Sequence, residues 1–298
     1  MPNVDELNPS YLEYIISGKN SIVKRWIRAG ASGWRLDVAD ELPDEFIKLL
    51  KQSIREEKSD TVLIGEVWED ASNKMSYSKK REYLFGYELD SITNYPLRQL
   101  IIEYSKKQIS SEYFIKRYKS LLENYPRENF FSTMNMLGTH DTERILTILE
   151  GKIEQLKIAV LLQMTLPGVP LIYYGDEAGV KGGKDPDNRK PYPWGKENIE
   201  VINIYKNLCS LRANENILKN GDIEFRNSFG NVLCFQRSNE EGIIIVIINS
   251  SDKEEKYILN NINGNAKNLI DDKETYESIK GTLNVILKGN QCKILKVQ

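Results

Sequence analysis

The spacing of apolar residues changes once along this chain, near residue 220. Upstream of that point, apolar residues recur at helical spacing over about residues 10–29, and Gly30 is a plausible end of that helix. Shorter apolar runs then alternate with longer periodic stretches, which predicts strands at 33–39, 61–67, 131–137 and 169–174 and helices at 46–57, 99–122 and 153–166. This alternation is typical of βα units built around a parallel sheet.

Downstream of residue 220 the apolar runs are short and β-rich, and Asn, Gly, Asp and Ser separate them. The runs are 232–236, 243–248, 256–259, 283–287 and 292–297. They predict a small antiparallel sandwich. We therefore expect an α/β part over 1–220 and an all-β domain over 221–298. The two should pack directly, because no low-complexity linker separates them.

A charged pair lies at the end of the first predicted strand. Arg35 and Asp37 are two positions apart, and because side chains alternate between the faces of a strand, both point to one side. An arginine fixed beside a carboxylate keeps it ionised and oriented, as a nucleophile requires. Taken alone, the pair favours a structural ion pair over a catalytic one.

Glu66 ends the next predicted strand, within Ile64-Gly-Glu-Val-Trp68. The glycine allows close approach, and Trp68 is an apolar neighbour that can raise the pKa of a carboxyl group. These features suit a general acid. The simpler interpretation is that an acidic residue at a strand end caps the following helix.

A third acidic group, Asp141, comes directly after His140, beyond the strand predicted at 131–137. His140 is the only histidine in the chain, which excludes a multi-histidine metal centre and acid-base chemistry based on several histidines. A lone histidine is more often structural than functional. However, acidic groups now end three parallel strands at the edge where parallel barrels build active sites.

Three carboxylates in this arrangement suit the cleavage of a glycosidic bond. Two carboxyls about 5 Å apart around an anomeric carbon allow double displacement. A third can bind ring hydroxyls and balance the charge of an oxocarbenium-like transition state.

Composition narrows the class of ligand. The 298 residues include 41 basic and 43 acidic side chains, so there is no basic surplus for nucleic-acid binding. Cys209, Cys234 and Cys292 lack the spacing of a disulfide framework or a zinc site. The first residues do not have a signal-peptide pattern, and no apolar run reaches membrane-spanning length. We expect a neutral or small polar ligand, no nucleic acid and no membrane.

Taken together, several motifs resemble the alpha-amylase superfamily (glycoside hydrolase family 13), and within it the neopullulanase, cyclomaltodextrinase and maltogenic amylase subgroup. The matching segments are Met1-Pro-Asn-Val with Asn8-Pro9, Gly33-Trp-Arg-Leu-Asp-Val-Ala39, Ile64-Gly-Glu-Val-Trp68, Asn94-Tyr-Pro96, Leu137-Gly-Thr-His-Asp-Thr-Glu-Arg144, Pro167-Gly-Val-Pro-Leu-Ile-Tyr-Tyr-Gly-Asp-Glu177, and Gly182-Gly-Lys-Asp-Pro-Asp-Asn-Arg189 with Pro193-Trp194. Asn188 stands where the family loop usually has cysteine, a change that we expect to leave the chemistry unaltered.

The resemblance implies a retaining α-glycoside hydrolase or transglycosylase that acts on α-1,4-linked glucans or maltodextrins, and it leaves activity on α-1,6 linkages open. It implies Asp37 as nucleophile, Glu66 as acid and then base, and Asp141 as transition-state stabiliser. The expected substrate-binding residues are Arg35, His140, Asp40, Glu41, Trp68, Asp187 and Arg189. For Asp40, Glu41, Asp187 and Arg189 an ordinary solvated charge cluster is the open alternative. No cofactor or metal is expected, and a cytoplasmic location fits the subgroup.

The superfamily's catalytic domain is a (β/α)8 barrel, of which this sequence supplies roughly strands 4–8. We therefore expect a partial TIM barrel over 1–220 followed by the β-sandwich, and little or no activity from this segment alone. Open sheet edges should favour self-association or pairing with the missing N-terminal half. Two alternatives stay open. One is the same mechanism with a branching, isomerising or trehalose-forming outcome, and the other is a non-catalytic carbohydrate-binding or assembly subunit.

Overall fold

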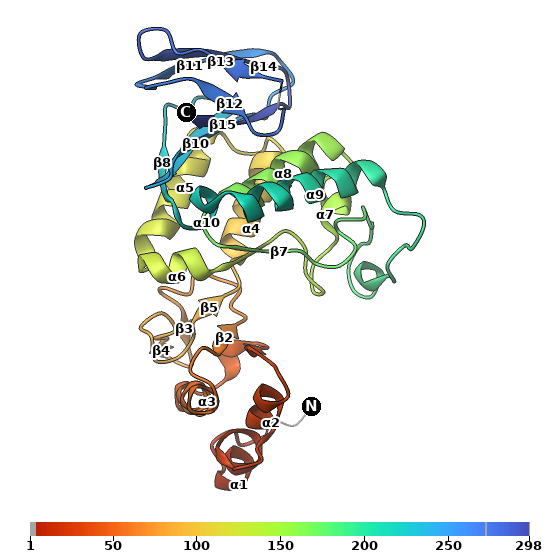
Figure 1. The fold of residues 1–298 in the computed structure, drawn as a ribbon. Coiled ribbons are helices and arrows are strands. Elements are labelled where there is room, and N and C mark those ends of the chain that lie inside the picture. Colours follow the sequence, from red (N-terminus) through yellow and green to blue (C-terminus); the bar gives the residue numbers. More distant parts are fainter. Residues whose placement is uncertain (1–3, 272, 298) are drawn as a thin grey trace. The chain divides into compact units, whose positions relative to one another are not determined.

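The computed structural model describes residues 4–271 and 273–297, so the start of the first matching motif, Met1-Pro-Asn, lies outside the described part. The chain divides into two compact units (Figure 1). Unit 1 comprises Met1–Pro96 with Leu121–Met134, and unit 2 comprises Leu97–Ser120 with Asn135–Gln298.

Unit 1 begins with helices that the sequence pattern joined into one. The segments are α1 (Pro9–Leu12), the π-helical turn η1 (Glu13–Ser17) and α2 (Ile22–Arg28). The prediction of a single helix over 10–29 is wrong, because the chain leaves the helix at Gly18, where a Cβ atom would lie 2.5 Å from the Glu13 carbonyl oxygen. The predicted stop is correct: Gly30 has a φ of +109°, which favours glycine.

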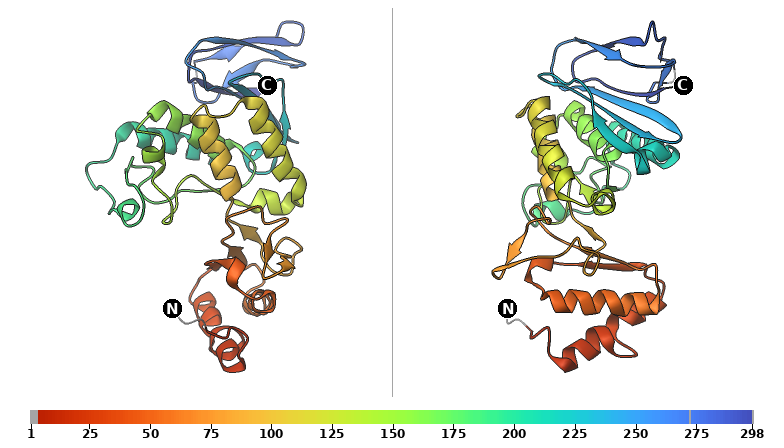
Figure 2. Two further views of the ribbon diagram at one scale, coloured as in Figure 1. Left: turned by 180° about the vertical axis from the view of Figure 1, so that it is seen from behind. Right: turned by 90° about the vertical axis from the view of Figure 1, so that its left-hand side faces the viewer.

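The centre of unit 1 is a small parallel sheet. Strands β1 (Gly33–Leu36), β2 (Val62–Gly65) and β5 (Ser91–Ile92) lie in that order, and α3 (Asp44–Glu57) connects the first two. Helix α3 lies between α2 and β2 (Figure 2) and buries Ile47, Leu50 and Ile54. The hairpin β3–β4 (Met75–Ser76, Lys79–Lys80) and α6 (Arg127–Ser132) complete the unit.

Within the described residues, β1 pairs on one side only, with β2. Such an edge presents unpaired backbone donors and acceptors. Self-association through it stays a prediction.

Unit 2 contains most of the long helices. In chain order its segments are α4 (Tyr95–Ser105), α5 (Ser111–Asn124), β6 (Met134–Met136), α7 (Ile145–Ile148), α8 (Ile153–Thr165), β7 (Val169–Leu171), the 3-10 turn η3 (Asp187–Arg189), α9 (Ile199–Asn214) and α10 (Asn216–Asn220). The first residues of α4 and β6 and the last residues of α5 belong to unit 1. Helices α8 and α9 pack side by side (Figure 1). The helix predicted over 99–122 is two helices, because Lys107 adopts a φ of +62° that no helix continues through.

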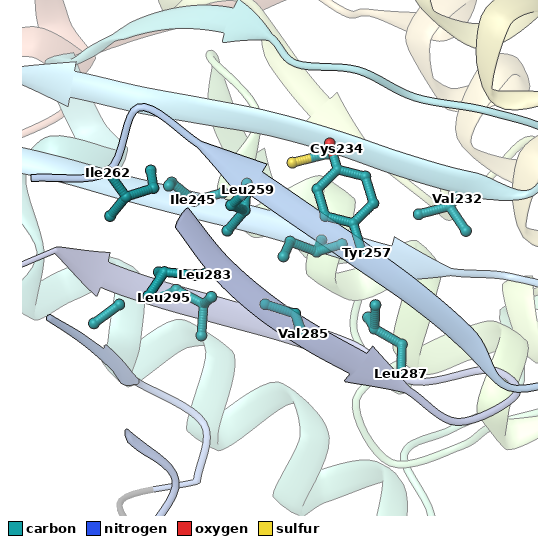
Figure 3. Close-up of a cluster of buried hydrophobic side chains, with 12 residues drawn as sticks. Val232, Cys234, Ile245, Tyr257, Leu259, Ile262, Leu283, Val285, Leu287 and Leu295 are labelled. Atoms are coloured by element: carbon teal, nitrogen blue, oxygen red, sulfur yellow. The ribbon is translucent and has the colours of Figure 1, made fainter. Parts of the chain in front are cut away.

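The C-terminal strands enclose an apolar core. One sheet has the order β13-β12-β15-β10-β9-β8 and the other is β11-β14. Their bounds are β8 (Asp222–Phe225), β9 (Val232–Asn239), β10 (Gly242–Asn249), β11 (Glu255–Asn260), β12 (Ala266–Asn268), β13 (Thr275–Tyr276), β14 (Thr282–Leu287) and β15 (Cys292–Val297). Figure 3 shows side chains of both sheets meeting in this core, among them Ile245, Tyr257 and Leu295.

The change from helices to strands falls where the apolar pattern changes, since α10 ends at Asn220 and β8 begins at Asp222. The compact units divide the chain elsewhere, so a domain boundary near Gly221 stays a prediction. Among the described residues, no helix combines the length and the apolar character needed to cross a bilayer.

Leu283 and Ile286 on β14 test how this core is built. Leu283 is fully buried, whereas Ile286 is 51% exposed. Leu283→Ala should lower the free energy of unfolding by about 2–5 kcal/mol, because it removes buried methyl groups and leaves a cavity. Ile286→Ala is the matched control and should change it by about 0.5 kcal/mol at most. Urea denaturation measures both, and equal losses would contradict the inward placement of Leu283.

Candidate active site

One guanidinium group joins two of the predicted catalytic carboxylates in unit 1. Arg35 Nη1 lies 2.5 Å from Asp37 Oδ1, and Arg35 Nη2 lies 2.7 Å from Glu66 Oε1. The parallel register of β1 and β2 sets this up, because Arg35 pairs with Ile64 and the Glu66 N–H donates to the Leu36 carbonyl. Since a guanidinium is only a few ångström across, the two carboxyls lie close together at the carboxyl ends of adjacent strands.

The two carboxylates have very different surroundings. The Asp37 side chain is 72% exposed, whereas Glu66 is 3% exposed. The second Glu66 oxygen, Oε2, accepts from the Val38 N–H at 3.0 Å. Val38 has a φ of +43°, a left-handed conformation that costs a β-branched residue about 1–3 kcal/mol. The strained backbone at Val38, in the turn after β1, therefore directs the Val38 N–H towards Glu66.

The other unit 1 candidates follow β1 and β2 in the chain. Trp68 is 46% exposed and stacks on Tyr95, with ring centroids 4.1 Å apart and an interplanar angle of 9°. Glu41 is exposed and lines a pocket of about 330 Å³ together with Tyr77. Their roles in substrate binding stay predictions.

Asp40 lies in the turn η2 (Ala39–Glu41), and both oxygens of its carboxylate contact other side chains. The Tyr83 hydroxyl donates to Oδ1 at 2.8 Å, and Lys74 Nζ lies 3.0 Å from Oδ2. These contacts tie the segment around the β3–β4 hairpin to the turn that follows Asp37. A direct role of Asp40 in substrate binding stays a prediction.

In unit 2, the loop after β6 carries the third candidate carboxylate. His140 Nε2 lies 3.0 Å from Asp141 Oδ2, and Arg189 Nη2 lies 3.4 Å from Asp141 Oδ1. Arg189 also pairs with Asp185 at 2.7 Å. The structure thus brings together three of the predicted residues, and both basic side chains face the carboxylate of Asp141.

Asp187, also predicted to bind substrate, contacts its own loop. Its carboxylate lies 2.7 Å from Lys190 Nζ and accepts from the Gly183 N–H at 2.6 Å. The Lys190 hydrogen bond, followed by that from Gly183, lowers the pKa of Asp187. Asp187 therefore stabilises the loop that carries Arg189, and its contact with substrate stays a prediction.

A buried charged residue, Arg144, holds the loops of unit 2 and was not among the predicted site residues. Its Nε donates to the Asn188 carbonyl at 2.6 Å, and its Nη1 donates to the Tyr174 carbonyl and lies 3.1 Å from Asp176 Oδ1. Arg144 and Asp176 both lie within segments that resemble the family, but the order of residues there does not indicate that the two side chains are buried.

Asp176 also explains the glycine that precedes the stabiliser loop. A Cβ atom at Gly138 would lie 2.1 Å from Asp176 Oδ2, so only glycine fits there. Burial raises the pKa of Asp176 to about 7, although the charge of Arg144 acts in the opposite direction.

No cluster of three or more histidine, cysteine or acidic side chains suited to a metal ion occurs within 4–271 and 273–297.

The sequence matches the family model of the alpha-amylase catalytic domain over residues 2–201. A cyclomaltodextrinase of Thermoanaerobacter pseudethanolicus is 34% identical over 300 residues, which cover 99% of this chain and 49% of that protein. Neopullulanase 2 of Thermoactinomyces vulgaris is 31% identical, with the same coverage of both chains. The present chain spans about half the length of these two relatives.

Solved structures show the same similarity. A cyclomaltodextrinase superposes with a TM-score of 0.83 at 30% identity, over 92% of this chain and 47% of that chain. The debranching enzyme of Nostoc punctiforme superposes with a TM-score of 0.85 at 26% identity, over 97% of this chain and 62% of that chain.

The raised pKa of Asp176 predicts a specific pH dependence of stability. Between the ordinary value of 3.8 and about 7, the unfolded chain has lost a proton that the folded chain still holds. The contribution of Asp176 to the free energy of unfolding is therefore fully present below about pH 4 and falls as pH rises towards 7.

Asp176→Asn removes this titration. Urea unfolding should show that the free energy of unfolding of the wild type, minus that of the variant, falls between about pH 4 and 7 and is level above pH 7. A difference that is constant over this range would contradict the raised pKa.

Proposed function

Because this chain belongs to the alpha-amylase family, we propose that it carries the catalytic carboxylates of a retaining α-glucan hydrolase. The observation that supports this most directly is the Arg35 guanidinium, which contacts Asp37 and Glu66 together. Retaining glycosidases need two neighbouring carboxyls, about 5–5.5 Å apart, whereas inverting enzymes need a wider gap to admit a water molecule.

In the proposed reaction, Asp37 attacks the anomeric carbon while Glu66 donates a proton to the leaving glycosidic oxygen. The bond that breaks releases one sugar product, and the bond that forms is an ester between glucose and Asp37. Glu66, now a carboxylate, takes a proton from water, whose oxygen attacks the same carbon and releases Asp37. Exposure suits the role of Asp37, which is open to a substrate, and the contacts with Arg35 and the Val38 N–H fix the orientation of Glu66.

Asp141 is the proposed stabiliser of the transition state. Two observations support this role: the motif in which Asp141 lies and the contacts of its carboxylate. A carboxylate held by His140 and Arg189 is fixed in orientation before substrate arrives. Preorganised charge of this kind stabilises a cationic transition state without reorganisation during the reaction. His140, Arg189 and Asp187 are the proposed contacts to sugar hydroxyls.

The proposed substrates are α-1,4-linked glucans or maltodextrins, with α-1,6 linkages as a second specificity. The names of the relatives support this range, since they include cyclomaltodextrinase, neopullulanase and amylopullulanase. We also propose that turnover by these 298 residues alone is weak, because the relatives are about twice as long and correct positioning supplies much of an enzyme's rate.

Glu66→Gln tests the proposed acid. It keeps the shape of the side chain but removes the transferable proton, so turnover of maltoheptaose should fall by at least about 100-fold. Glu69→Gln is the matched control, because the Glu69 side chain is 63% exposed and its carboxylate pairs with Lys74. Labelling of new reducing ends measures the rate, and NMR of the first product should show the α-anomer.

Three results bear against the proposal. Equal rates for Glu66→Gln and wild type, or a first product with the β-anomeric configuration, would exclude the assigned acid or the retaining mechanism. Sugar binding by the wild-type chain without any turnover would favour the non-catalytic binding subunit instead.

A further inference from the structure

The side chain of Asn188, in the turn η3, contacts the backbone on both sides of Asp141. Its Nδ2 donates two hydrogen bonds, to the His140 carbonyl at 2.7 Å and to the Thr142 carbonyl at 2.9 Å. These are the residues immediately before and after Asp141. Asn188 is 0% exposed, so water does not compete for the two carbonyls from its side.

The two carbonyl partners fix the orientation of the amide. Carbonyl oxygens only accept hydrogen bonds, so the nitrogen of the amide must face them and its oxygen must face away. A cysteine at this position could donate one weak S–H hydrogen bond at most. The amide of Asn188 therefore holds this loop by two hydrogen bonds, where a cysteine would supply one at most.

Further hydrogen bonds hold Asn188 and the loop around Asp141. The Asn188 carbonyl accepts from the buried Arg144 at 2.6 Å, and the neighbouring Arg189 Nε also donates to the His140 carbonyl, at 3.1 Å. On the other side of the loop, the Asp141 N–H donates to the Thr139 hydroxyl at 3.2 Å. The backbone on each side of Asp141 is thus held by donors that do not depend on substrate.

We propose that Asn188 is a positioning residue, which holds the backbone on both sides of Asp141 and so fixes the direction of its carboxylate. This inference rests on the proposed function for its effect on rate, but the placement of Asp141 and His140 can be tested without turnover. Asn188 is not assigned any contact with substrate.

The single histidine makes the test direct, because the ring signals of His140 need no assignment by mutation. Asn188→Cys leaves one weak donor at most, and Asn188→Asp places acceptor oxygens against two carbonyls. Both variants should shift the His140 ring signals in carbon–proton NMR spectra. Both should also lower kcat by about 10- to 100-fold, with a smaller change in KM, since a misplacement of about 1 Å is enough for such a loss.

Asn198→Ala is the control for stability alone. Asn198 accepts hydrogen bonds from the Glu200 and Val201 N–H groups at the start of α9, so this variant also loses two hydrogen bonds of the same unit. It should lower the melting temperature and leave the His140 signals and kcat at wild-type values. Asn188→Cys keeps the test valid if Asn188→Asp does not fold.

Unchanged His140 signals and an unchanged kcat in Asn188→Cys, with a lowered melting temperature as in Asn198→Ala, would overturn the proposal. If the wild-type chain turns over no α-glucan, the proposed function fails, and the His140 signals alone decide the inference. Shifted signals in the Asn188 variants but not in Asn198→Ala would then still support the positioning role.

Discussion

The chemistry assigned to this chain depends on one interaction, the contact of the Arg35 guanidinium with both Asp37 and Glu66. Two carboxylates so close together would repel each other, and a planar cation with donors on two nitrogens offsets that repulsion. The parallel pairing of β1 with β2 places the arginine and the buried glutamate side by side. The strained turn at Val38 is tolerated in the same place, since its N–H donates to Glu66.

In unit 2, too, one arginine contacts several partners, but this arginine, Arg144, is buried. A buried charge is costly unless it is paired and hydrogen-bonded, and Arg144 meets that condition by donating to the carbonyls of Tyr174 and Asn188 and pairing with Asp176. Polar contacts of Arg144 therefore fix the loop that carries Arg189. Asn188 extends this arrangement to the residues that flank Asp141.

Local patterns in the sequence were enough for the parts that depend on neighbours in the chain. The apolar spacing located α3 and the β-rich C-terminal region, and period-2 geometry put Arg35 beside Asp37. Helix breaks were missed at Gly18 and Lys107, because the apolar spacing continues across both and only the backbone conformation changes.

Contacts between distant segments could not be predicted from the sequence. Asn188 was expected to be a neutral replacement because its two partners are more than forty residues away in the chain. For the same reason, the contacts of Asp40 with Lys74 and Tyr83 have no local signal. The sequence thus indicated candidate catalytic residues, and the structure adds which residues contact and orient them.

The most direct test of the double displacement is to trap its covalent intermediate. An α-glucosyl fluoride with a second fluorine on the sugar ring forms the ester but hydrolyses it slowly. After tryptic cleavage, mass spectrometry should find the added fluoroglucosyl mass on the peptide 36–48, and fragmentation should place it on Asp37 rather than on Asp40 or Glu41. Release of fluoride without any adduct, or an adduct on another residue, would contradict the role of Asp37 as the nucleophile.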